Sequence, residues 1–288
     1  MRGSPARVFG VLGPANVGKT CLLTAFFLEL AQGQHHDLPY RFAGSRSLLG
    51  FQALCERAAT WGGSPGQEIV DRTKVGENDD ASVFFHLSLR PRSQSDDRVV
   101  DVLLTDVPGE WVTDLAANDS LETRQRLAWL PRADVVMALV DAPALVEQGG
   151  QREDLRFSRV IERALEVSRE SERHPAVVVV FTKVDKLREQ LPTSPEALKQ
   201  PETWPIFVSK ARRVLAALAR GREQGVNIRS FAVSAFPSTM EGGHPVNVMA
   251  PFVWAMSQAD ARACWEWPAP PTPAGAQGFL AVRRWSRQ

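Results

Sequence analysis

Cysteine and lysine are scarce in this chain of 288 residues, and neither sign of charge predominates. The 3 cysteines, Cys21, Cys55 and Cys264, form neither a CxxC pair nor a disulfide framework, which predicts free thiols in a reducing compartment. The 34 Lys and Arg residues balance 33 Asp and Glu residues, so no overall charge attracts the chain to nucleic acid or to an anionic membrane.

Long apolar runs are also absent. No stretch approaches the roughly 20 residues that span a bilayer, and the N-terminal residues lack the apolar segment and cleavage site of a secretory signal. We therefore expect a cytoplasmic protein without a transmembrane segment. Only 6 of the 34 basic residues are lysines, so a lysine inside a motif carries more weight than usual.

The order of apolar segments predicts an α/β fold. Short apolar runs alternate with longer amphipathic stretches, as in βα units around a mostly parallel sheet. The expected strands are 7–12, 82–89, 99–105, 134–140, 176–181 and 228–233, with the second and third joined as a hairpin. The expected helices are 18–31, 152–172, 204–219 and 247–264.

One domain is expected to cover residues 7–264, since 44% apolar residues can supply a full core. An insertion at about 34–80, with a helix near 48–60, is too long for an ordinary connection. Residues 265–278 form a Pro- and Ala-rich linker, and 279–288 form a C-terminal tail segment.

The strongest motif is GPANVGKT, residues 13–20, between an expected strand and an expected helix. It matches GxxxxGK[ST], in which glycines let backbone N–H groups and a helix N-terminus approach phosphate oxygens. In this motif Lys19 neutralises the β- and γ-phosphates, and the Thr20 hydroxyl ligates Mg²⁺. The predicted contacts of the loop and the first helical turn are Gly13, Asn16, Val17, Gly18, Lys19, Thr20 and Cys21.

A second motif predicts which nucleotide base is recognised. A buried-type strand runs into Thr182, Lys183, Val184 and Asp185, which resembles the [NT]KxD element of GTP-binding proteins. There the aspartate accepts two hydrogen bonds from guanine, and adenine cannot supply that pair of donors. Thr182 replaces the commoner Asn, which predicts a weaker tether to the phosphate loop. Ser234 and Ala235, in VSAF, resemble the SA element that reaches the guanine O6.

The third motif is TDVPG, residues 105–109, after the third expected strand. It resembles the DxxG element of GTPases, where the Asp holds Mg²⁺ through a water and the Gly N–H meets the γ-phosphate. Asp106 and Gly109 take these positions.

Together the motifs resemble P-loop GTPases of the translation-factor and Ras-like (TRAFAC) class, over residues 7–264. The resemblance implies a P-loop NTPase fold, a Ras-like three-layer α/β/α arrangement with a six-stranded sheet in the order 2-3-1-4-5-6. It also implies GTP or GDP and Mg²⁺ as ligands. NVGKT, FAGSRSL, DVPGEW and VNVMAPFVW resemble the bacterial double-GTPase families more closely, which implies a nucleotide-controlled assembly role.

The residues that would complete hydrolysis are less specific. The resemblance implies a switch threonine that completes the Mg²⁺ shell, and Thr73 lies in about the right place, with Thr60 as the runner-up. Arg72 is a candidate arginine finger in cis. An ordinary solvated loop accounts equally well for either threonine, and an ordinary surface arginine is the commoner role for Arg72.

Glu110 occupies the position where Ras-like proteins carry Gln. An ionised carboxylate can only accept hydrogen bonds, so it is either a general base or a charge that opposes attack on the γ-phosphate. It could equally lie in solvent at a helix start. Trp111 and Trp61 are partner anchors only if they are exposed.

These observations predict a Mg²⁺-dependent GTP-binding switch with slow, partner-stimulated hydrolysis in a bacterial multi-protein system. Protein partners are expected at 34–80 and 106–120. The alternatives are a pseudo-GTPase scaffold without turnover and a P-loop kinase of a small acceptor, which TKVD disfavours. An ABC-type ATPase is disfavoured because no LSGGQ-like segment occurs.

Overall fold

The computed structural model describes residues 6–33, 38–47, 84–92, 99–117, 120–190, 192, 194–236 and 245–266. The expected helix at 48–60, most of the insertion and the tail lie outside these residues, as do Thr60, Trp61, Arg72 and Thr73. No helix in the described part of the chain is long and apolar enough to cross a membrane.

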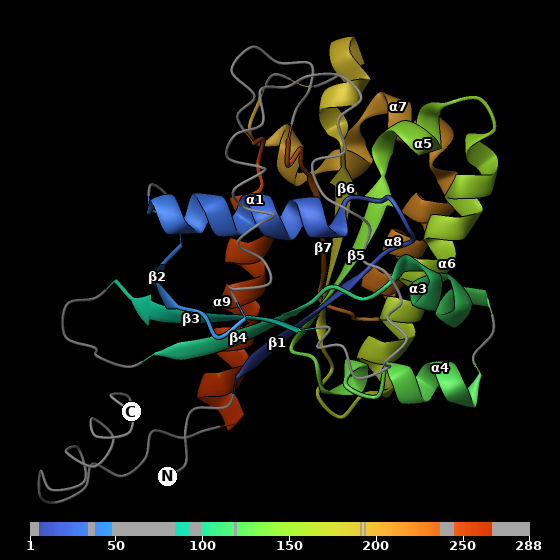
Figure 1. Ribbon diagram of the computed structural model, residues 1–288. Coiled ribbons are helices and arrows are strands. Elements are labelled where there is room, and N and C mark those ends of the chain that lie inside the picture. The colour runs from blue at the N-terminus through green and yellow to red at the C-terminus, as the bar shows by residue number, and fades with distance from the viewer. Residues whose placement is uncertain are drawn as a thin grey trace, which may run out of the picture.

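A seven-stranded sheet forms the centre of the molecule, in the order β2-β3-β4-β1-β5-β6-β7 (Figure 1). Strand β3 pairs antiparallel with both β2 and β4. From β4 onward, β4, β1, β5, β6 and β7 run parallel to one another. The strands are β1 (Arg7–Leu12), β2 (Tyr40–Gly44), β3 (Phe84–Pro91), β4 (Val100–Thr105), β5 (Val135–Asp141), β6 (Ala176–Thr182) and β7 (Ile228–Ala232).

The expected order of six strands is confirmed, and β2 is an additional strand at the edge. The prediction of six strands was wrong in number because β2 has only 5 residues, of which Tyr40 alone is buried. This is a weak pattern within a stretch interpreted as an insertion. At the centre, β6 is buried along its whole length and β5 along all but its last residue. This is typical of parallel strands covered on both faces.

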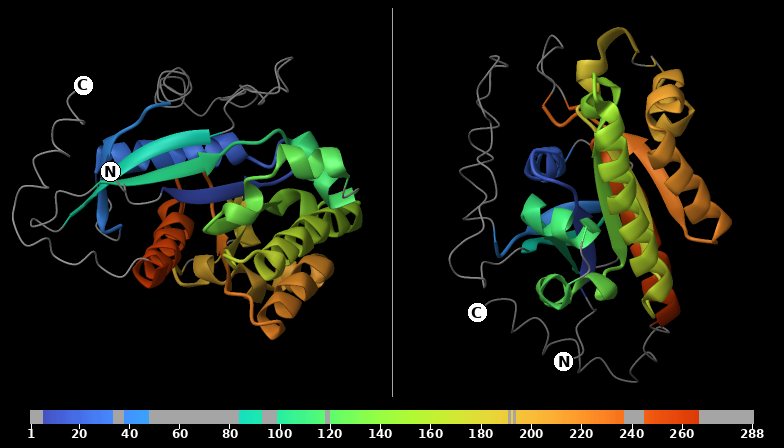
Figure 2. Two further views of the ribbon diagram at one scale, coloured as in Figure 1. Left: turned by 90° about the horizontal axis from the view of Figure 1, so that it is seen from below. Right: turned by 90° about the vertical axis from the view of Figure 1, so that its right-hand side faces the viewer.

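Helices lie on both sides of the sheet, as right-handed crossovers require. Figure 2 shows α1 (Lys19–Gln32) on the side opposite α6 (Gly150–Glu170) and α8 (Arg212–Glu223). The last helix, α9 (Met249–Glu266), meets α1 where Phe252 stacks on Phe26, with ring centroids 3.8 Å apart. It continues two residues into the range 265–278 expected as linker.

The helix expected at 204–219 is in fact two, α7 (Pro205–Lys210) and α8, separated at Ala211. The carboxylate of Asp154, in α6, accepts hydrogen bonds from the backbone N–H groups of Arg213 and Val214, each 3.0 Å away. A buried carboxylate thus caps α8 from another helix, a contact that periodicity cannot reveal.

Short helices connect the longer elements and were not predicted. They are α3 (Gly109–Ala117), α4 (Leu121–Arg126), α5 (Ala142–Val146) and the 3₁₀ turns η1 (Leu130–Arg132), η2 (Val184–Gln190), η3 (Ala197–Lys199) and η4 (Pro201–Thr203).

Candidate functional site

The predicted site residues gather at the carboxyl ends of the parallel strands. GPANVGKT follows β1, TDVPG follows β4 and TKVD follows β6, and this edge is where open α/β sheets bind ligands. The structure therefore brings three separate motifs to one place.

The phosphate loop has the backbone that its glycines predict. Gly18, the N-cap of α1, has φ 94°, a left-handed conformation that favours glycine. Gly13 is needed for a different reason, since a Cβ there would lie 2.6 Å from Cγ1 of Val17. No side chain caps the N-terminus of α1, so its N–H groups face the loop as an anion-binding end.

Lys19 is buried inside this loop. Its Nζ donates to the carbonyl oxygens of Gly13, at 2.8 Å, and Pro14, at 3.1 Å. Burial lowers the pKa of Lys19 from its ordinary value, while the nearby carboxylates of Asp106 and Glu110 act in the opposite direction. The amine therefore lies among carbonyl oxygen atoms at the start of α1.

Thr20 and Asp106 form a pair suited to Mg²⁺. The Thr20 hydroxyl donates to Oδ2 of Asp106 across 2.8 Å. Both are hard oxygen donors, and Mg²⁺ is usually held by one or two carboxylates together with phosphates and water. The two residues fit the ion that the motifs imply, and their role as ligands stays a prediction.

Gly109 touches the phosphate loop itself. A Cβ at this position would lie 2.0 Å from the backbone nitrogen of Ala15, a distance that no side chain could occupy. The close approach places the first residue of α3 against the loop, and its contact with a γ-phosphate stays a prediction.

The base-recognition motif is joined to the phosphate loop by Thr182. Its hydroxyl lies 2.8 Å from the carbonyl oxygen of Val17 and 3.1 Å from that of Val140. Thr182 therefore forms a tether in place of the commoner Asn, although its single proton is shared between two acceptors.

Asp185 is also buried, and the Ser234 hydroxyl donates to its Oδ1 at 2.5 Å. Ser234 therefore orients the carboxylate that is predicted to bind guanine. Ala235 follows Ser234 and is half-buried, so the SA element lies beside TKVD as the resemblance implies.

Lys183 bridges the two loops. Its Nζ donates to the carbonyl oxygen of Asn16 at 2.5 Å and to Oδ2 of Asp141 at 2.6 Å. Both Asn16 and Lys183 have positive φ, 65° and 58°. Sequence reasoning missed Asp141, whose position at the end of β5 was the only available signal.

Glu110 and Trp111 differ in their exposure. Glu110 is exposed in the first turn of α3, whereas Trp111 is buried, with the Arg126 guanidinium 5.5 Å from its ring centroid. Trp111 is therefore part of the core, and it is not the exposed tryptophan that a partner anchor would require. Glu110 still acts on Lys19 through its charge.

Cys21, next to Thr20, is half-buried and is a free thiol. Burial raises the pKa of this thiol to about 11, so the group is neutral near pH 7. Its predicted contribution to nucleotide binding therefore does not involve a thiolate.

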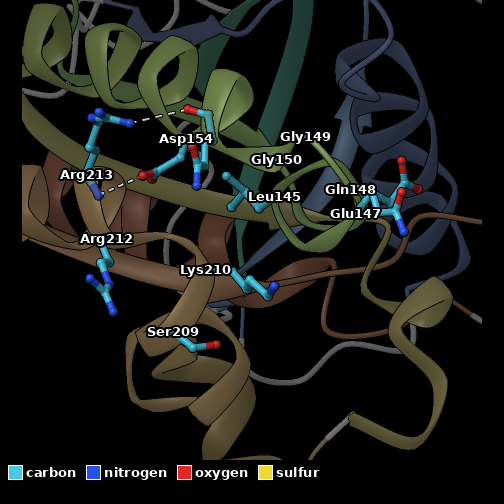
Figure 3. A pocket seen from close by; sticks show the side chains of 11 residues that line it. Leu145, Glu147, Gln148, Gly149, Gly150, Asp154, Ser209, Lys210, Arg212 and Arg213 are labelled. Atoms are coloured by element: carbon cyan, nitrogen blue, oxygen red, sulfur yellow. Dashed lines mark hydrogen bonds between the residues drawn. The ribbon is translucent and has the colours of Figure 1, made fainter.

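A pocket of about 900 Å³ opens elsewhere, between the α5–α6 turn and the α7–α8 segment (Figure 3). The residues that line it include none of the predicted site residues. Its most buried polar group, Asp154, is already engaged in capping α8.

Comparisons with family models and with solved structures each find a similarity to this chain. A family model described as Double-GTPase 2 matches residues 7–254. No curated protein matches the sequence at a significant level.

Two solved structures illustrate the structural similarity. The Arl6 BBS3 small GTPase from Trypanosoma brucei, with a bound nucleotide analogue, has 12% identity and a TM-score of 0.43, covering 89% of this chain and 99% of that chain. The signal recognition particle receptor SRb-GTP/SRX complex from Chaetomium thermophilum has 16% identity and a TM-score of 0.43, covering 80% of this chain and 91% of that chain.

Proposed function

Because the chain belongs to the Double-GTPase 2 family, we propose that it binds GTP and GDP with Mg²⁺ and hydrolyses GTP slowly. It acts as a nucleotide-controlled switch in the cytoplasm, within a bacterial multi-protein system, and protein partners at 34–80 and 106–120 stimulate its turnover.

The observation that carries this proposal is the Thr182–Val17 tether, 2.8 Å long. It connects the loop that would recognise guanine to the loop that would hold the phosphates. Asp185, oriented by Ser234, then faces the same ligand as Lys19. A nucleotide whose base and phosphates are both recognised fits this geometry better than a phosphate compound alone.

Slow turnover follows from Glu110. An exposed carboxylate in the first turn of α3 adds negative charge near an anionic γ-phosphate, which opposes attack unless a cation offsets it. In related switches, an arginine from a partner raises the rate by about 10³ to 10⁵. This supports stimulation by a partner protein.

The second candidate, a pseudo-GTPase scaffold, is favoured by the same exposed carboxylate. It would bind GTP with the same selectivity but release no phosphate. The two functions therefore differ in turnover alone.

The test is to measure binding of GTP and ATP, and phosphate release without an acceptor, by the purified chain with Mg²⁺. We expect a preference for GTP, and Asp185→Asn should lower GTP affinity by about 10- to 100-fold because one of the two acceptor oxygens for the guanine donors is replaced by an NH₂ donor. Lys19→Ala should abolish binding, whereas Lys210→Ala, at an exposed lysine outside the predicted site, should not.

Preference for ATP, or unchanged GTP selectivity in Asp185→Asn, would contradict the proposal. GTP binding without any phosphate release, with or without a cell extract, would favour the scaffold. Transfer of phosphate only to an added small acceptor would favour a kinase.

A further inference from the structure

Arg156 reaches from α6 to the helix that follows TDVPG. Its Nη2 donates to the Thr113 hydroxyl oxygen across 3.3 Å, and that hydroxyl donates to the carbonyl oxygen of Gly109 across 3.0 Å. A hydroxyl has one proton and two lone pairs, so Thr113 can accept from Arg156 and donate to Gly109 at once. The three residues form a continuous chain of hydrogen bonds.

This chain ends at a residue that has little freedom to move. Gly109 is pressed against Ala15, where a Cβ would lie 2.0 Å from the backbone nitrogen. The phosphate loop therefore limits Gly109 on one side, and Thr113 holds its carbonyl oxygen on the other. The two contacts act on the Gly109 N–H, which lies in the preceding peptide unit, by fixing the position of the Gly109 Cα.

Arg156 is not held firmly elsewhere. Its ionic contact is with Glu153, where Nη1 of Arg156 lies 3.6 Å from Oε2, and the side chains of Arg156 and Glu153 are 39% and 32% exposed. An exposed pair of this kind contributes little. The guanidinium is also close enough to Lys19 to lower the pKa of that amine, which is the opposite of the effect of Glu110. The charge of Arg156 therefore opposes that of Glu110 in its effect on Lys19.

We propose that Arg156 is a positioning residue for γ-phosphate recognition, and that it acts through Thr113 to hold the Gly109 N–H toward the γ-phosphate. The inference rests on the proposed function, because only a γ-phosphate distinguishes GTP from GDP at this position. No motif in the sequence marks Arg156; the packing of α3 against α6 brings it there (Figure 1).

The consequence is a specific change in nucleotide preference. Loss of the hydrogen bonds that link Arg156, Thr113 and Gly109 should weaken binding of a non-hydrolysable GTP analogue by about three- to tenfold, the range for one hydrogen bond. GDP has no γ-phosphate, so its affinity should not change. A merely structural role for Arg156 would weaken both nucleotides equally.

The experiment compares the affinities of the full chain for the GTP analogue and for GDP by calorimetry with Mg²⁺. Arg156→Ala and Thr113→Val should each lower the affinity for the GTP analogue without changing that for GDP. The double variant should show no further loss, because both residues act through the same series of hydrogen bonds. Thr113→Ser keeps the hydroxyl and should retain wild-type affinity. The matched control is Arg159→Ala, which removes an exposed arginine one turn further along α6.

Equal losses for both nucleotides in Arg156→Ala, or no loss, would overturn the inference. So would wild-type affinity in Thr113→Val, since the effect of Arg156 would then be one of charge alone. Failure of the wild-type chain to bind either nucleotide would instead overturn the proposed function. Binding of both nucleotides with an unchanged ratio in the variants would leave the proposed function standing.

Discussion

The Thr182 hydroxyl lies 2.8 Å from the carbonyl oxygen of Val17, 165 residues earlier in the chain. This contact makes the phosphate loop and the base-recognition loop one structural unit. Both residues are buried, so water cannot replace the bond when it is lost.

Replacing Thr182 with Val should therefore weaken nucleotide binding. The substitution keeps the shape but leaves a buried carbonyl oxygen without its donor, at a cost of about 1–3 kcal/mol. We expect lower affinity for GTP and GDP alike and a lower melting temperature, measured by calorimetry and circular dichroism. Thr182→Ser retains the hydroxyl and serves as the control; wild-type affinity in Thr182→Val would show that the tether is dispensable.

Gly109→Ala should disrupt the γ-phosphate contact. The new Cβ would lie 2.0 Å from the Ala15 nitrogen, so α3 must move away from the loop, with strain of about 1–3 kcal/mol. We expect at least about tenfold weaker binding of a GTP analogue, by calorimetry. Gly44→Ala is the matched control, because a Cβ there meets nothing within 4 Å. Equal affinities of Gly109→Ala and Gly44→Ala for the GTP analogue would contradict the prediction.

Glu110→Gln should raise the rate of GTP hydrolysis a few-fold. The amide removes a negative charge beside the γ-phosphate and supplies a donor that the carboxylate lacks. Single-turnover phosphate release from Glu110→Gln and Glu110→Ala measures this effect. If both variants instead lose about 10²-fold or more in rate, Glu110 is a general base.

Asp141→Asn should speed the release of GDP. The carboxylate of Asp141 holds Nζ of Lys183 at 2.6 Å, with side chains 17% and 30% exposed, and loss of this partly buried pair should increase the dissociation rate by about two- to tenfold. Stopped-flow displacement of a fluorescent GDP measures the rate. Glu162→Gln, which breaks the exposed pair with Arg220, should not change it; an equal effect of both variants would count against a role for Asp141.

Glu29→Gln should stabilise the fold at neutral and higher pH. Burial raises the pKa of Glu29 to about 7, whereas the unfolded value is about 4.3. Between these values the folded chain keeps a proton that the unfolded chain releases, so this group lowers stability as pH rises through the window. The melting temperature of the variant should therefore exceed that of wild type at pH 8, and by a smaller amount at pH 5.

The control for this experiment is Glu223→Gln, at an exposed position on α8. Its melting temperature should differ from wild type by the same small amount at both pH values. A difference for Glu29→Gln that did not grow with pH would show that Glu29 is ionised in the folded chain throughout.

Much of the fold could be predicted because its signals are local. Apolar runs identified six strands, and each motif follows directly after a strand, so the motifs were expected at one edge of the sheet. The strand order was implied by the resemblance to Ras-like GTPases. Helices with strong periodicity, such as α6, were located to within two residues. The edge strand β2 was missed because its pattern is short and half-exposed.

The sequence by itself determined the phosphate loop, the positions of six strands and the residue types available for a guanine nucleotide, since these depend on neighbours along the chain. Only the tertiary structure decided the contacts that orient them: Thr182 with Val17, Lys183 with Asp141, Asp154 at the start of α8, and Arg156 with Thr113. Each joins residues more than 40 positions apart. Such contacts leave no periodic signal, because they arise from the way two finished elements pack against each other.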